Sequence, residues 1–130
     1  MINSDLQQLS KDFFQNSLDS SPTSAIMRGH KQYFDQIEEL NEETFEKETK
    51  AVNDFISRLE SIDTESLSNR EKVTHGMLEF ALSSNKDSLM DRSWEFGAGV
   101  SGFTGFLIDY NQQMFVPDSE SADMLLKRLE

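Results

Sequence analysis

Two neighbouring segments, residues 41–62 and 68–90, carry apolar residues at the spacing of an α-helix, and only a short turn from Asp63 to Leu67 separates them. The apolar positions of the first segment form one stripe, made by Phe45, Val52, Phe55, Ile56, Leu59 and Ile62. A turn of this length reverses the chain direction between two helices. The pattern therefore predicts two long antiparallel amphipathic helices, the centre of an all-α fold.

The outer face of the first segment carries acid–base pairs four residues apart, namely Glu43 with Lys47, Glu46 with Lys50, and Asp54 with Arg58. An acid that precedes a base by four residues favours a helix by roughly 0.2–0.5 kcal/mol per pair. The charge pairs therefore predict the same helix as the apolar stripe.

The second segment begins with Ser68 and Glu71, three residues apart, which is the spacing of a capping box. Its apolar positions are Val73, Met77, Leu78, Phe80, Ala81, Leu82 and Leu89. They cover about half of the helix circumference, and a helix of this kind expects more than one neighbour. We therefore expect a fragment of this length to expose an apolar patch.

Shorter helices are expected before this pair. Ile2, Leu6, Leu9 and Phe13 predict a helix that ends near Leu18. A second helix should begin at Pro22 with Ser21 as its cap and stop at Gly29. The connector from His30 to Leu40 has three candidate anchors, Tyr33, Phe34 and Ile37.

The C-terminal third contains a glycine-rich stretch, which is expected to be an irregular apolar segment. Four glycines lie between Gly97 and Gly105, too many for a helix interior. After Pro117, Asp118 and Ser119 are candidate caps for a last helix carrying Met124, Leu125 and Leu129. We expect residues 1–130 to form a single helical unit.

The formal net charge of -12 argues against binding to nucleic acid or to an anionic membrane surface. Eleven acids and three bases lie between Asp35 and Glu65, typical of a solvated helix face. Cysteine is absent, so a disulfide or thiolate site is excluded. Neither a signal peptide nor an apolar run of membrane-spanning length is evident, and the expected location is the cytoplasm.

One motif suggests nucleotide binding. Residues 97–102 match G-x-G-x-x-G, but the preceding residues do not read as a buried strand and no strand–helix–strand pattern occurs. The bare match does not predict a nucleotide site.

Metal and acid–base sites are equally incomplete. His30 and His75 are the only histidines, H-E-x-x-H is absent, and both positions favour structural roles. Residues 118–123 alternate acids as calcium loops do, but lack the required glycine and later glutamate. Glu38, Glu39, Glu42 and Glu43 show no sign of the burial that an acid–base pair needs. We therefore predict no catalytic, cofactor-binding or metal-binding residue in this chain.

Four groups of residues between positions 21 and 82 carry a resemblance to a known family, namely 21–25 with Gly29, then 33–35, 59–63 and 67–73. They resemble the N-terminal region of the bacterial domain-of-unknown-function family 885, whose full-length members are helical and zinc-peptidase-like. Residues 123–129 are similar to the segment that follows the glycine-containing stretch of the family. The resemblance implies a larger metallopeptidase-like domain, whose H-E-x-x-H motif lies several hundred residues downstream and has no counterpart here.

Two hypotheses follow for function. The resemblance implies a non-catalytic N-terminal scaffold of a zinc-peptidase-like hydrolase, with zinc only in the full-length parent and the remainder of that domain as partner. The alternative is a free-standing helical interaction module that binds a helical protein partner. Continuation of the reading frame past Glu130 would favour the first.

Overall fold

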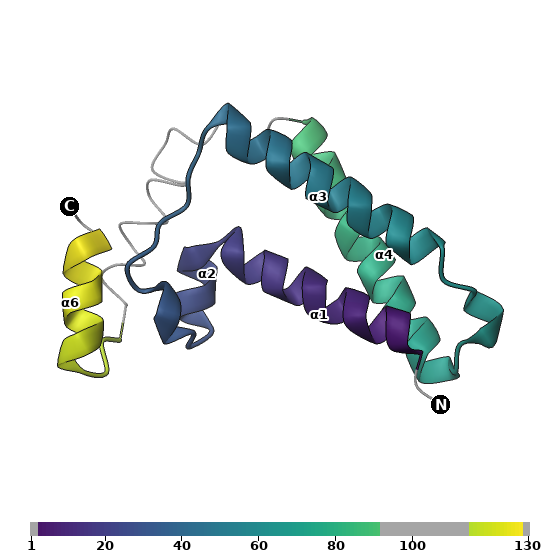
Figure 1. Ribbon diagram of the computed structural model, residues 1–130, viewed down its shortest axis with the longest axis horizontal. Coiled ribbons are helices and arrows are strands. Elements are labelled where there is room, and N and C mark those ends of the chain that lie inside the picture. The colour runs from purple at the N-terminus through teal and green to yellow at the C-terminus, as the bar shows by residue number, and fades with distance from the viewer. Residues whose placement is uncertain (1–2, 92–114, 129–130) are drawn as a thin grey trace. The chain divides into compact units, whose positions relative to one another are not determined.

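The computed structural model describes residues 3–91 and 115–128, and every regular element within them is helical (Figure 1). The elements are α1 (Ser4–Asp19), α2 (Pro22–Met27), η1 (Lys31–Tyr33), α3 (Glu42–Glu60), η2 (Thr64–Ser66), α4 (Asn69–Met90) and α6 (Ser119–Arg128). The all-α prediction is confirmed. The glycine-rich stretch with its G-x-G-x-x-G motif, and Leu129, lie outside the described residues.

The chain divides into two compact units, Met1–Asn16 with Leu40–Ser93, and Ser17–Glu39 with Trp94–Glu130. The boundary of the first part falls within α1. Each unit has its own cluster of buried apolar side chains. The prediction that residues 1–130 form one domain stays a prediction.

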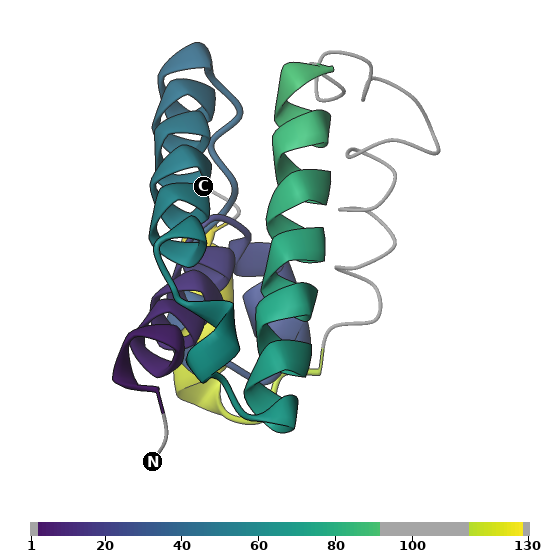
Figure 2. The same cartoon turned by 90° about the vertical axis from the view of Figure 1, so that its right-hand side faces the viewer.

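The first unit contains the predicted helix pair, and α3 and α4 run antiparallel side by side (Figure 2). The Asn41 side chain accepts a hydrogen bond from the Thr44 amide and starts α3. Asp63 accepts from the Glu65 amide and shapes the turn η2. Ser68 and Glu71 form the predicted capping box at the start of α4. These local hydrogen bonds explain why both helices begin where the sequence predicts.

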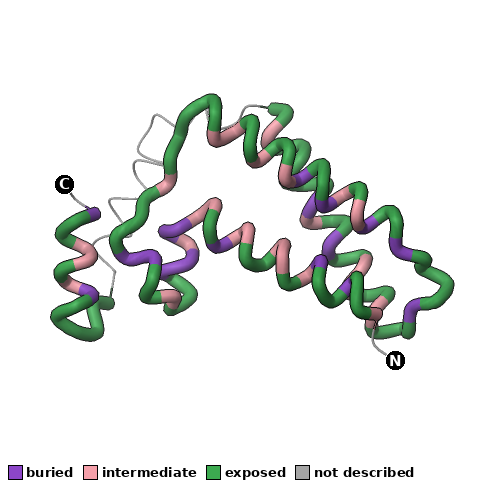
Figure 3. Tube along the Cα trace, viewed as in Figure 1, coloured by how far each residue is buried: buried purple, intermediate pink, exposed green. Residues whose placement is uncertain are grey.

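Helix α1 joins this pair in one core. The buried members are Leu6, Leu9, Val52, Phe55, Leu59, Ile62, Leu67, Leu78 and Leu82. Figure 3 shows the buried positions of α1, α3 and α4 gathered where the three helices approach one another. The Phe13 ring packs edge-on against Phe55, with the ring centroids 5.8 Å apart. Such pairs add to the stabilisation from apolar burial.

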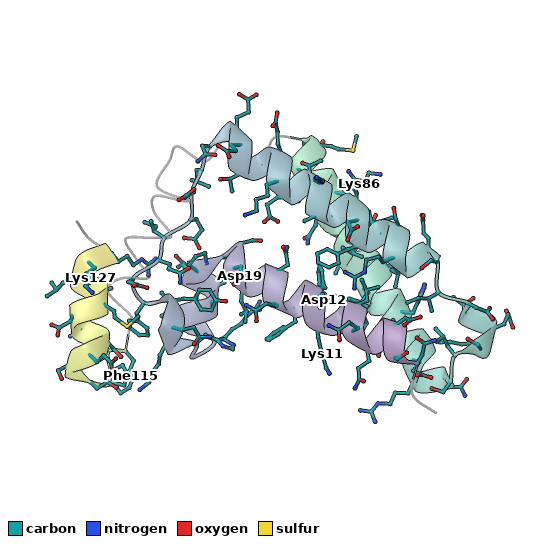
Figure 4. All side chains as sticks on the ribbon, viewed as in Figure 1. Lys11, Asp12, Asp19, Lys86, Phe115 and Lys127 are labelled. Carbon is teal, nitrogen blue, oxygen red and sulfur yellow. The ribbon has the colours of Figure 1, made fainter. Side chains whose placement is uncertain are left out.

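Arg58 links α3 to α1 at the margin of this core. Its Nη2 lies 2.6 Å from the carboxylate of Asp12, a residue labelled in Figure 4, and this contact lowers the pKa of Asp12. Arg58 also lies 3.9 Å from Asp54, the third predicted pair along α3. Among the described residues, neither of the other two predicted pairs lies within 4.0 Å.

The second unit is built around α2 and η1. Pro22 begins α2 and Gly29 follows its end with φ of +89°, the left-handed conformation that favours glycine. The Ser21 side chain does not cap α2, contrary to expectation. Instead, Glu38 accepts hydrogen bonds from the Thr23 amide at 2.9 Å and from the Thr23 hydroxyl at 2.7 Å. A carboxylate from the connector replaces the adjacent serine because it reaches both donors.

Buried apolar residues of the second unit are Leu18, Ala25, Ile26, Tyr33 and Phe34, with Met124 and Leu125 of α6 packed against them. Tyr33 and Phe34 thus anchor the connector as predicted. The third expected anchor, Ile37, is 47% exposed. The prediction that Ile37 anchors the connector is wrong, because at η1 only the side chains of Tyr33 and Phe34 enter this cluster.

The predicted cap of the last helix is present. Asp118 accepts a hydrogen bond from the Ser121 amide at 2.8 Å and pairs with Lys31 at 2.9 Å. Hydrogen bonds from the Ser121 hydroxyl, from Lys31 and from the Ser121 amide hold the pKa of Asp118 well below its usual range. At the other end of α6, the buried Arg128 donates from Nη2 to the Thr23 hydroxyl at 2.5 Å. Arg128 thereby joins α6 to α2.

Candidate interaction surface

Helix α4 is apolar on two opposite sides. Leu78 and Leu82 face the core and are 7% and 1% exposed. At about 100° per residue, the opposite side carries Val73, Met77 and Phe80. These three are 63%, 68% and 76% exposed. The half-apolar arc predicted from the sequence therefore separates into a buried stripe and an exposed one.

Gly76 belongs to the exposed stripe, because it lies three residues after Val73 and four before Phe80. A Cβ atom added at Gly76 would meet nothing within 4 Å. A glycine inside a helix costs about 1 kcal/mol relative to alanine. Crowding around α4 therefore does not explain why a glycine occupies this position. We call Val73, Gly76, Met77 and Phe80 the outer α4 face.

Polar residues bordering the outer α4 face are exposed. Asn69 and Lys72 lie near its start and Asp87 near its end. None of their side chains has a hydrogen bond or ion pair among the described residues. Over its whole length α4 contains three acids and three bases, so this helix is neutral within a chain of net charge -12. Another protein that approaches the outer α4 face therefore meets a helix without net negative charge.

A cavity of about 530 Å³ lies where α1 and α4 begin, with Leu6, Gln7, Arg70 and Thr74 in its lining. Among the described lining residues the one carboxylate belongs to Glu71, whose oxygens accept from the Asn3 amide at 2.6 Å and the Ser68 amide at 2.9 Å. These bonds and the Ser68 hydroxyl lower the pKa of Glu71 to about 2. A carboxylate so engaged joins the starts of two helices and is a poor proton acceptor near neutral pH.

A second cavity of about 260 Å³ lies between α3 and α4 and contains Glu60, His75, Glu79 and Lys86. The His75 Nε2 atom lies 3.4 Å from the Leu59 carbonyl oxygen, near the end of α3. This contact is the structural role that the sequence favours for His75. Residues 3–91 and 115–128 contain no group of three or more potential ligand side chains arranged to hold a metal ion.

The remaining residues considered from the sequence have local contacts or exposed positions. The His30 ring packs edge-on against Tyr33, with centroids 6.5 Å apart. Glu38 caps α2, and Asp118 caps α6 rather than beginning a calcium loop. Glu39, Glu42 and Glu43 are exposed positions near the start of α3.

Sequence reasoning missed Gly76 and Arg128. A glycine amid the apolar residues of a capped helix was a signal for the outer α4 face, because glycine disfavours helices. No local pattern marks Arg128, whose Nη1 atom is buried with no hydrogen-bond partner in the part of the chain that the structure describes. Its burial depends on Thr23, which lies 105 positions earlier in the chain.

Comparison with models of known families finds no match, and neither a curated protein nor a solved structure shows significant similarity to the chain. The resemblance to the zinc-peptidase-like family stays a prediction. Within the described residues, no helix has both the length and the apolar character needed to cross a membrane.

Proposed function

We propose that this chain is a non-catalytic helical scaffold that associates with further polypeptide through the outer α4 face. The observation that supports the proposal is the exposure of Val73, Met77 and Phe80 on the side of α4 away from its core. Exposed apolar side chains gathered on one helix face are typical of a protein interaction surface. The capping bonds and the core hold this helix in place.

The resemblance described above supports one source of that polypeptide, the remainder of a zinc-peptidase-like hydrolase. In this form of the proposal the zinc ion and catalytic residues belong to the remainder, and the present chain supplies a wall of helices. A cytoplasmic location is part of the same proposal. Continuation of the reading frame beyond Glu130 is the observation that would favour this source.

A second candidate is an independent helical interaction module with a helical protein partner. The arrangement of α4 supports it, because a single exposed helix face suits binding in a groove or against another helix. Both candidate functions use the outer α4 face as the surface of association. They differ in whether the partner is covalently continuous with the chain.

Replacing Phe80 with lysine tests the shared part of the proposal. The unchanged chain should bind a hydrophobic dye and self-associate, as measured by fluorescence and by size-exclusion chromatography with light scattering. Phe80→Lys should reduce both signals because it replaces the most exposed apolar side chain of the face with a charge. Leu126→Lys on α6 is the matched control, since Leu126 is 61% exposed and lies in the other unit. A clean monomer that binds no dye would contradict the proposal.

Adding the downstream region separates the two candidates. A scaffold segment should lose dye binding and irregular self-association when the downstream region of the reading frame is restored. An independent module should already run as one defined species with a cooperative unfolding transition. The same chromatography distinguishes these results.

A further inference from the structure

We propose that the outer α4 face binds a second copy of this chain, with the two α4 helices antiparallel. The inference rests on the proposed function, because it takes this face as the surface of association. The new element is the partner and its register, which follow from the shape and charge of α4 itself.

Shape provides the first argument. Phe80 projects from the face with 76% of its surface exposed, while Gly76, one turn earlier, leaves open space around its backbone. In an antiparallel pair whose two-fold axis crosses the outer α4 face at the height of position 78, Phe80 of each copy lies opposite Gly76 of the other. Val73, Gly76, Met77 and Phe80 have the spacing of the four residues that form a hole for a knob from a facing helix. The face is thus complementary to itself, as a two-fold interface requires.

Charge provides the second argument. In the same register Asp87 of each copy lies opposite Asn69 of the other, with Lys72 one turn further along the same edge. Each of these side chains is exposed and has no partner among the described residues. The pairing gives the carboxylate an amide donor and a cation, and symmetry repeats the contact. It also brings together two helices that each carry no net charge, which limits repulsion between the acidic chains.

A glycine in the middle of α4 is explained by this arrangement. Any larger side chain at position 76 would occupy the space that the partner's aromatic ring enters. The unpaired chain would gain helix stability from alanine at this position, because nothing surrounds the added methyl group. Glycine therefore favours the pair over the single chain.

Exchanging the charges of Lys72 and Asp87 tests the antiparallel register. Sedimentation equilibrium of the full chain measures the dissociation constant of the dimer. The unchanged protein should form a dimer at micromolar concentration. Lys72→Asp and Asp87→Lys should each weaken dimerisation by about tenfold, since each places like charges at two symmetric contacts. The double variant should restore the dissociation constant to near its original value, because it re-forms both pairs with exchanged signs. A parallel pair would not show this rescue.

Steric variants provide an independent test. Gly76→Leu should abolish the dimer while raising the unfolding temperature of the monomer, since leucine favours helices and meets no neighbour. Asn85→Ala is the control for helix propensity, because Asn85 is exposed on α4 away from the outer face. Circular dichroism should show that both variants remain folded. The control should dimerise like the unchanged protein.

The outcomes separate this inference from the function on which it rests. A dimer that Phe80→Lys disrupts, but that neither Gly76→Leu nor the charge exchange affects, overturns the antiparallel register alone. Association without fixed stoichiometry overturns the second copy as partner and leaves the outer α4 face as an association surface. A monomer that binds no hydrophobic dye overturns both.

Discussion

Single side chains decide where the helices of this chain begin. Glu71 completes the capping box with Ser68 and also accepts from the Asn3 amide, so one carboxylate satisfies donors at the starts of α1 and α4. Backbone amides in the first turn of a helix have no partner within the helix. A side chain that supplies the acceptor therefore stabilises the element and determines its first residue.

Replacing Ser68 with alanine should lower the free energy of unfolding by about 1 kcal/mol, because the Glu71 amide loses its acceptor. Urea unfolding followed by circular dichroism measures the change. Ser83→Ala is the matched control, since Ser83 is exposed within α4 and its side chain has no hydrogen bond among the described residues. An unchanged midpoint for Ser68→Ala would mean that α4 begins elsewhere.

Glu71 should make stability depend on pH in the acid range. Its pKa is about 2 in the folded chain against an ordinary 4.5, so the folded state favours the ionised form. The resulting stabilisation is fully present above about pH 4.5 and is lost as the pH falls towards 2. Urea unfolding from pH 6 to pH 2 should show the difference between the unchanged chain and Glu71→Gln shrinking over that interval. A constant difference would contradict the assignment.

At the scale of the element, α4 performs two tasks with opposite sides. Leu78 and Leu82 pack in the core with α1 and α3, while Val73, Met77 and Phe80 are exposed. Both sides are apolar, so the sequence pattern of α4 does not distinguish them. Only the placement of the neighbouring helices assigns one side to folding and the other to the proposed association.

Alanine substitutions on the two sides should differ strongly. Leu82→Ala should cost about 2–5 kcal/mol, because it leaves a cavity around a side chain that is 1% exposed. Phe80→Ala should change the stability of the monomer by about 0.5 kcal/mol or less. Denaturant unfolding at concentrations too low for association measures both. Equal losses would show that Phe80 packs within the monomer.

At the scale of the whole molecule, the two units have separate cores and are stabilised by different kinds of contact. The first depends on a continuous apolar cluster from three helices. Among the described residues, the second has the smaller apolar cluster and adds polar contacts, in which Thr23 accepts from Arg128 and donates to Glu38. A small apolar cluster contributes little stability, so such buried polar contacts matter more to the second unit.

The chain should not bind zinc tightly. His75 contacts the end of α3 in the first unit, and His30 packs on Tyr33 in the second. A tetrahedral zinc site needs three or four ligands that converge on one point. Calorimetric titration of the purified chain with zinc should therefore detect no stoichiometric submicromolar site. Such a site would require a new account of both histidines.

The sequence by itself determined the features that depend on residues a few positions apart. It predicted the antiparallel α3–α4 pair, the capping box at Ser68, the end of α2 at Gly29 and the Asp118 cap, because each is satisfied by local hydrogen bonds or helix periodicity. Tertiary structure alone decided which stripe of α4 is buried, since both stripes are apolar. It also decided that Glu38 rather than Ser21 caps α2 and that Arg128 is buried on Thr23. These contacts join residues distant in the chain, and their energies depend on packing that no local pattern records.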